Sequence, residues 1–148
     1  MHLLTTSNPK LMKGEKKGYL SFVLHLAPSN VSGYNTCPMA SNGCRAACLN
    51  TAGRGGFFKP GTSTNSIQEA RIRKTRLFFE DRAGFLSLLV SDIQAAIRTA
   101  ERKNLIPVFR LNGTSDIRWE SVAVEGFPNL MARFPAVQFY DYTKPVSY

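Results

Sequence analysis

The chain has 148 residues, of which 43% are hydrophobic, and carries a formal net charge of +9. A chain of this length and composition can bury one hydrophobic core, which excludes an intrinsically disordered protein. The excess of positive charge favours an anionic partner, such as nucleic acid, a nucleotide or a phosphorylated metabolite. The sequence has neither the ~20 apolar residues of a membrane span nor a signal-peptide core, so we expect a cytoplasmic protein without a membrane partner.

The N-terminal third of the chain predicts one buried strand followed by a long loop. Residues 1–17 are polar and basic, and predict a loosely ordered arm or at most a hairpin strand. Tyr19–Leu26 is almost continuously apolar, aromatic and β-branched, which is typical of a parallel strand buried on both faces. Residues 27–64 then form a cysteine- and glycine-rich loop at the carboxyl end of this strand, where α/β folds build their sites.

Two helices are predicted after this loop. Asn65 or Thr64 can cap a helix over Ser66–Glu80. A second helix over Ala83–Lys103 carries a stripe of apolar residues at i+3 and i+4 spacing, which predicts a face turned toward the core. The residues of this stripe are Leu86, Leu89, Ile93, Ile97 and Ala100.

Strands and helices continue to alternate in the rest of the chain. Leu105–Leu111 and Val137–Thr143 predict strands, with short helices over Ile117–Val124 and Phe127–Phe134 between them. The alternation predicts a single α/β domain over residues 1–148, with a small, mostly parallel sheet and crossover helices. Three strands are too few to close a barrel.

All three cysteines, Cys37, Cys44 and Cys48, lie in one Gly- and Asn-rich segment with the spacing C-x6-C-x3-C. An odd number of closely spaced cysteines in a cytoplasmic chain argues against a disulfide framework. Three thiolates on one loop suit a [4Fe-4S] cluster with one iron left open to another ligand. Zinc is the alternative, because it also binds thiolates but needs a fourth ligand in a structural site. His25 is a candidate for that ligand, although a strand histidine is more often packed or hydrogen-bonded.

The first predicted helix carries cations on two faces. At 100° per residue, Arg71 and Lys74 fall on the same stripe as apolar residues, whereas Arg73 and Arg76 fall on the opposite face. The stripe cations either extend their charged ends to the rim of the core or point at an anion.

Polar residues gather where the second predicted strand ends. Arg110 and Asn112 lie on one face of that strand, and Asn112–Asp116 is a turn sequence. We expect six residues to bind the cofactor or its ligand: Arg71, Lys74, Arg110, Asn112, Thr114 and Ser115. Asp116 is the candidate acid–base residue or fourth ligand, and it can equally cap the short helix that starts at Ile117.

The blocks CPMASNGCRAACLNTAGRG, RIRKTRLF and RLNGTSDIRWE resemble, in sequence and in order, the phage gene product 88 family. The resemblance spans Tyr19–Glu120, and the chain looks like a shortened member. It implies a phage-encoded protein of the host bacterial cytoplasm. The layout is also similar to that of radical S-adenosylmethionine enzymes, partial (β/α) barrels with three cysteines after the first strand. Their spacing is C-x3-C-x2-C, so binding of S-adenosylmethionine does not follow.

These observations predict an iron–sulfur protein with an open iron, which is a redox or radical-type enzyme or binds a small anionic ligand. The alternative is a nucleic-acid-binding module with a structural zinc, in which the basic run Arg71–Arg76 contacts phosphates. An open sheet with unpaired edges further predicts a symmetric homo-oligomer that associates through Val137–Thr143.

Overall fold

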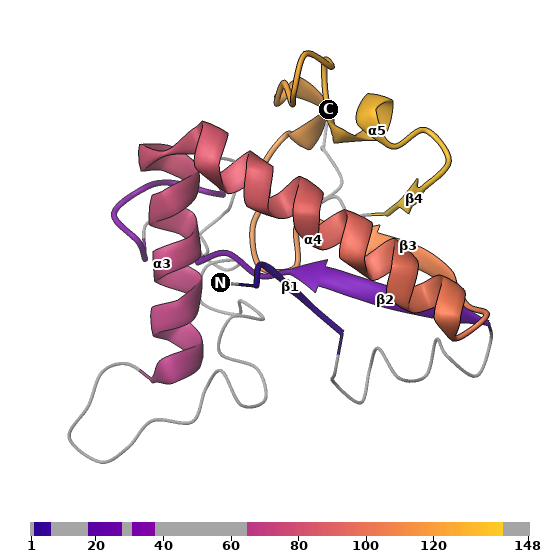
Figure 1. The fold of residues 1–148 in the computed structure, drawn as a ribbon. Coiled ribbons are helices and arrows are strands. Elements are labelled where there is room, and N and C mark those ends of the chain that lie inside the picture. The colour runs from indigo at the N-terminus through magenta and orange to yellow at the C-terminus, as the bar shows by residue number, and fades with distance from the viewer. Residues whose placement is uncertain (1, 7–17, 28–30, 38–64, 141–148) are drawn as a thin grey trace, which may run out of the picture. The chain divides into compact units, whose positions relative to one another are not determined.

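The computed structural model describes residues 2–6, 18–27, 31–37 and 65–140 of the chain (Figure 1). The chain divides into two compact units. We call the first the sheet unit, which consists of Met1–Leu24, Leu88–Gly113 and Arg118–Tyr148. We call the second the loop–helix unit, which consists of His25–Ser87 and Thr114–Ile117.

In its described residues the sheet unit has four strands, in the order β1-β2-β3-β4. They are β1 (Leu4–Thr5), β2 (Tyr19–Leu24), β3 (Ile106–Arg110) and β4 (Gln138–Phe139). β1 is antiparallel to β2, whereas β2 with β3 and β3 with β4 are parallel pairs. The prediction of a small α/β fold with an open, mostly parallel sheet is therefore confirmed, and the antiparallel β1 makes the sheet mixed. The extension of one domain over the whole chain stays a prediction.

Aromatic residues of the parallel strands form part of the core of the sheet unit. Phe22 and Phe109 are register partners, and their rings stack with centroids 5.4 Å apart. The Phe109 ring also lies 5.7 Å from that of Phe139 on β4. The continuous apolar run of β2 is thus explained by burial within a parallel sheet.

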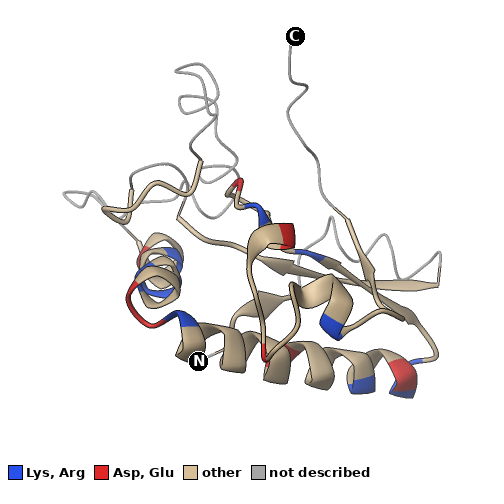
Figure 2. Ribbon diagram, turned by 90° about the horizontal axis from the view of Figure 1, so that it is seen from above, with Lys and Arg blue, Asp and Glu red and all other residues tan. Residues whose placement is uncertain are grey.

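Helix α4 (Arg82–Arg102) runs along one face of the sheet through its C-terminal half, as both views of the fold show (Figure 1, Figure 2). Leu89, Ile93 and Ala100 of the predicted stripe are buried. The predicted helix Ala83–Lys103 and its core-facing stripe are therefore confirmed, with each boundary one residue earlier in the structure.

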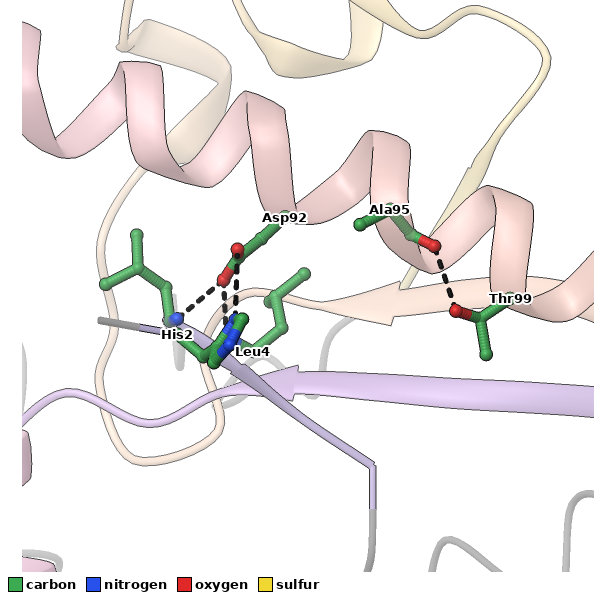
Figure 3. A network of polar contacts seen from close by, with 6 residues as sticks. His2, Leu4, Asp92, Ala95 and Thr99 are labelled. Atoms are coloured by element: carbon green, nitrogen blue, oxygen red, sulfur yellow. Dashed lines mark hydrogen bonds and ion pairs between the residues drawn. The ribbon is translucent and has the colours of Figure 1, made fainter.

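The N-terminal strand is fixed to both β2 and α4. The Thr6 hydroxyl donates a hydrogen bond to the Ser21 carbonyl at 2.7 Å. The Asp92 carboxylate of α4 accepts from the backbone N–H of Leu3 at 2.6 Å and of Leu4 at 3.3 Å (Figure 3). The hairpin strand that the sequence allowed within residues 1–17 is thus present at β1, while residues 7–17 lie outside the described residues.

The loop–helix unit contains helix α3 (Ser66–Glu80), whose bounds are those predicted. Asn65 is its N-cap, and its side chain accepts a hydrogen bond from the Gln68 N–H at 2.9 Å. The Asp81 carboxylate then accepts from the Gly84 N–H at 3.1 Å in the first turn of α4. A Cβ at position 84 would clash with the Asp81 side chain, so glycine there leaves room for this cap.

Two predicted short helices are mostly absent from the structure. In place of Ile117–Val124 there is one 3₁₀ turn, η3 (Trp119–Ser121), and in place of Phe127–Phe134 one helical turn, α5 (Leu130–Arg133). Between these two segments lies a tight turn in which Val124 and Phe127 exchange backbone hydrogen bonds. Its central residues, Glu125 and Gly126, have positive φ angles of 47° and 82°, which are incompatible with a continuing helix.

All three predicted strands are shorter in the structure, and β3 covers Ile106–Arg110 of the predicted Leu105–Leu111. β2 ends at Leu24 instead of Leu26, and β4 covers only Gln138–Phe139 of the predicted Val137–Thr143. Residues 141–143 lie outside the described residues. Among the residues that the structure describes, no helix is long and apolar enough to cross a membrane.

Candidate functional site

The chain leaves β2 through Leu26 and Ala27, which are fully buried although neither lies in a strand. Buried backbone groups outside a sheet need other hydrogen-bond partners, and threonine hydroxyls supply them here. The Leu26 carbonyl accepts from Thr114, and the Ala27 carbonyl accepts from Thr36 at 2.7 Å. The Ala27 N–H donates to the hydroxyl of Thr75 at 2.8 Å. We call Thr36, Thr75 and Thr114 the threonine clamp.

The first cysteine of the predicted cluster loop follows the threonine clamp directly. Cys37 is half-buried, and its Sγ lies 3.8 Å from the hydroxyl oxygen of Thr36. The Cys37 N–H donates to the Asn35 side chain at 3.0 Å, and the Asp116 N–H donates to the Thr36 carbonyl at 2.8 Å. Cys37 therefore follows a buried residue, Thr36, whose hydroxyl and carbonyl are both hydrogen-bonded to other parts of the loop–helix unit.

The other two predicted ligands, Cys44 and Cys48, lie outside the described residues, so the structure does not test the three-cysteine set. Within the described part of the chain, no group of three or more His, Cys, Asp and Glu side chains could hold a metal ion. His25, the candidate fourth ligand, is half-buried in the loop–helix unit, and its Nδ1 atom is inaccessible to solvent.

The cations of α3 are distributed as the helical phase predicted. Lys74 is buried and Arg71 is half-buried, whereas Arg73 and Arg76 are exposed. The Nε of Arg76 also donates to the Ser32 carbonyl at 3.2 Å, so this exposed side chain fixes the loop before Cys37. The helical phase is confirmed, while the anion that Arg71 and Lys74 were expected to face stays a prediction.

The polar residues after β3 differ in their environments. Asn112 is buried, and its side-chain oxygen accepts a hydrogen bond from the Trp119 indole at 3.1 Å. Arg110 and Ser115 are half-buried. Thr114 belongs to the threonine clamp, so the structure gives a backbone-holding role to a residue expected to bind a ligand.

Asp116 is exposed, and its N–H, as described above, holds the Thr36 carbonyl. No helix begins at Ile117, so the expectation that Asp116 caps a helix there is wrong. Its assignment as an acid–base residue or fourth ligand stays a prediction.

A comparison with protein families shows to which family the chain belongs. The model of the gene product 88 family matches residues 2–148. The chain belongs to the gene product 88 family. This confirms the family, and with it the origin as a phage protein, that the three sequence blocks indicated. No curated protein and no solved structure matches this gene product 88 chain.

The environment of Tyr34 in this gene product 88 chain shifts the pKa of its phenol. Its hydroxyl donates to the Glu80 carboxylate at 3.3 Å, and its ring stacks on Phe79 with centroids 4.7 Å apart. Partial burial of the phenol, together with the charge and hydrogen bond of Glu80, raises the pKa of Tyr34, while Arg76 opposes this shift. The loop between β2 and Cys37 is therefore also anchored to the end of α3.

Sequence reasoning missed Thr36 and Thr75 as parts of the site. Threonine has no motif that marks it as a backbone clamp, and the partners are backbone groups distant in sequence. One feature of the sequence does indicate that such partners are needed. The apolar run Tyr19–Leu26 continues two residues beyond the strand, so its last backbone groups need partners outside the sheet.

Proposed function

We propose that this gene product 88 chain is a phage-encoded iron–sulfur protein that holds a [4Fe-4S] cluster on Cys37, Cys44 and Cys48. The observation that carries the proposal is the position of Cys37. It begins a loop with all three cysteines, directly after Thr36, whose hydroxyl is hydrogen-bonded to the buried backbone that leaves a central parallel strand. Sites of α/β proteins are built at this end of the strands.

The donor set fits such a group in its chemistry. Thiolates are the ligands of iron–sulfur clusters, and the half-buried Cys37 combines partial shielding with access for a ligand. When bound, a cluster with three thiolate ligands supplies one-electron redox chemistry and an iron open to an exogenous ligand. Lys74, buried on α3, is suited to balance the negative charge of the thiolates or of a small anionic substrate. Arg71 on the same helix is assigned the same role.

The remaining assignments follow from this proposal. Ser115 would line the site with a polar group, and Asp116 would exchange a proton with a bound ligand, whereas Asn112 and Thr114 serve the fold through their hydrogen bonds. The protein would work in the cytoplasm of the host bacterium as a redox or radical-type enzyme. A symmetric homo-oligomer that buries the edge strand β4 would pair the open side of the sheet. Light scattering that reports a monomer would contradict this last assignment.

A second candidate is a nucleic-acid-binding module with a structural zinc, and exposed cations favour it. Figure 2 shows basic residues on α3 and at both ends of α4. Arg73 and Arg76 are exposed on α3, where they could contact phosphates. These cations are interspersed with acidic residues such as Glu69 and Glu80, which weakens a continuous path for a nucleic-acid backbone.

Metal and sulfide analysis of anaerobically purified protein tests the proposal. We expect about four irons and four sulfides per chain, together with the paramagnetic resonance signal of a reduced [4Fe-4S] cluster. Replacement of Cys37, Cys44 or Cys48 by serine should remove most of the iron without unfolding the chain. Ser91→Ala, at an exposed position of α4, is the control and should retain the iron.

Full zinc loading without iron under these conditions would refute the iron–sulfur proposal and support the second candidate. That candidate further requires an affinity for DNA that falls steeply with salt. Iron that survives all three serine replacements would also contradict the assigned ligands.

A further inference from the structure

The three hydroxyls of the threonine clamp leave little freedom to the backbone around Ala27. Thr75 donates to the Arg71 carbonyl at 2.7 Å and at the same time accepts from the Ala27 N–H. A hydroxyl has one proton and two lone pairs, so this hydroxyl is used as both donor and acceptor. Thr36 uses its proton on the Ala27 carbonyl. Both side chains are at most 1% exposed, so water does not compete for these bonds.

The hydrogen bonds of the threonine clamp form a closed network that includes Thr36, the residue before the first cysteine. Thr114 holds Leu26, and two residues later the Asp116 N–H holds the Thr36 carbonyl. Thr36 in turn holds Ala27, the neighbour of Leu26. Thr36 is thus bonded through both its side chain and its main chain, and Cys37 is the next residue.

We propose that Thr36, Thr75 and Thr114 are positioning residues that hold Cys37 in place before it binds its metal. This inference rests on the proposed function, in which Cys37 is a cluster ligand. A ligand that is already in place loses less conformational freedom on binding, so the affinity for the group is higher. The same principle makes second-shell hydrogen bonds important to metal sites in general.

The contact between Cys37 and Thr36 adds a direct element to this role. In the free protein the thiol can donate a weak S–H bond to the hydroxyl oxygen, which lies 3.8 Å away. After loss of the thiol proton the hydroxyl is the only donor of that pair, and it can share its proton between the Ala27 carbonyl and the sulfur. Thr36 is therefore the member of the clamp with the largest expected effect.

Valine replacements separate the hydroxyl bonds from packing, because valine has nearly the shape of threonine. We expect Thr36→Val to weaken cluster binding by about fivefold, the factor that corresponds to one ordinary hydrogen bond, and so to lower the iron content per folded chain. Thr36→Ser keeps the hydroxyl and should restore the iron. A merely structural role would lower the folded fraction but leave the iron per folded chain unchanged.

Thr99→Val is the matched control. The Thr99 hydroxyl donates to the Ala95 carbonyl at 3.0 Å within α4, as Figure 3 shows, so the same substitution removes the same kind of bond elsewhere. The iron content of Thr99→Val should equal that of the unmodified chain. Equal losses in Thr99→Val and Thr36→Val would overturn the proposal.

A second measurement does not depend on the metal. In the full chain with Cys44→Ser and Cys48→Ser, Cys37 is the only thiol, and its alkylation by iodoacetamide reports how firmly it is held. Thr36→Val and Thr75→Val should raise the alkylation rate by about fivefold, while Thr36→Ser and Thr99→Val should not. Unchanged rates in both valine variants would overturn the proposal. If the unmodified chain binds no iron, the proposed function fails, and the alkylation rates alone decide whether the clamp holds Cys37.

Discussion

The indole nitrogen of Trp119 donates a hydrogen bond to the side-chain oxygen of Asn112 at 3.1 Å, and both residues are buried. This bond links the end of β3 to the 3₁₀ turn η3 within the sheet unit. Asn112 was expected to bind a cofactor or its ligand, yet its oxygen is used to orient the single tryptophan of the chain. Because buried polar groups are costly to leave without partners, this bond contributes to folding.

Asn112→Ala should therefore destabilise the protein more than it changes any cofactor. Loss of the acceptor leaves the buried indole N–H without this partner, which costs about 1–3 kcal/mol of unfolding free energy. Denaturant unfolding followed by the fluorescence of Trp119 measures this cost and reports the environment of the indole. Gln94→Ala, at an exposed position of α4, is the control and should be nearly neutral. A stable Asn112→Ala variant that loses its iron would instead support the ligand-binding role.

Tyr34 should weaken the folded state at alkaline pH. Partial burial and Glu80 raise the pKa of Tyr34 above its ordinary value of 10.0. The folded state thus favours the protonated phenol. The stability that the protonated Tyr34 contributes is fully present below pH 10.0, and it is lost as the pH rises through the higher pKa of Tyr34 in the folded state.

The tyrosinate absorbance of the unmodified chain minus that of Tyr34→Phe isolates this titration. In the Glu80→Gln variant the carboxylate charge is absent, so the pKa of Tyr34 should fall toward its ordinary value. Glu101→Gln, an exposed change on α4, should leave the titration in place. An identical Tyr34 titration in Glu80→Gln would show that the carboxylate does not act on the phenol.

Asp92→Ala should release the N-terminal strand from α4. The carboxylate accepts from two successive backbone N–H groups, of Leu3 and Leu4, and Leu3 is fully buried (Figure 3). We expect a loss of about 1–3 kcal/mol and faster hydrogen exchange of these two amides. His2 also lies 3.7 Å from Asp92, but its side chain is 95% exposed. His2→Ala should therefore cost less than about 1 kcal/mol. A larger cost for His2→Ala than for Asp92→Ala would refute this explanation.

Much of the fold could be predicted because the deciding interactions are local. The bounds of α3 follow from the Asn65 cap, and those of α4 from its apolar periodicity. β1 could not be predicted with the same assurance. Its two residues depend on pairing with Val23 and Leu24, which lie 18 and 20 positions later in the chain, and on the Asp92 carboxylate of α4.

The predicted end of β2 and the two predicted short helices were wrong. Leu26 is as apolar as a strand residue, but its carbonyl is held by a threonine 88 positions later in the chain. The sequences on both sides of the turn at Glu125 and Gly126 are compatible with helix, but each forms only one short helical turn in the structure. In the site, the cysteine motif and the phase of the α3 cations could be read from the sequence. The threonine clamp could not, because its partners are backbone groups.

The buried cation of α3 gives a last prediction, which separates the two candidate functions. Lys74 is 8% exposed, whereas Arg73, the preceding residue, is exposed on the other side of the helix. A cation near bound thiolates or an anionic ligand offsets their charge, and burial strengthens this effect because solvent screens it less. Lys74→Met preserves the length of the side chain and removes the charge. It should weaken cluster binding by about fivefold, which corresponds to about 1 kcal/mol, and so lower the iron content per folded chain.

Arg73→Met is the matched control, because it removes one positive charge from the same helix. It should leave the iron content unchanged if the charge of Lys74 acts on the cluster site. In the nucleic-acid-binding alternative the order is reversed. The exposed Arg73 would contact phosphates, so Arg73→Met would weaken DNA binding and reduce its salt dependence. Lys74→Met would then change stability alone. Iron analysis and salt-dependent DNA titrations of the two variants therefore distinguish a buried charge that stabilises a metal centre from an exposed charge that binds a phosphate backbone.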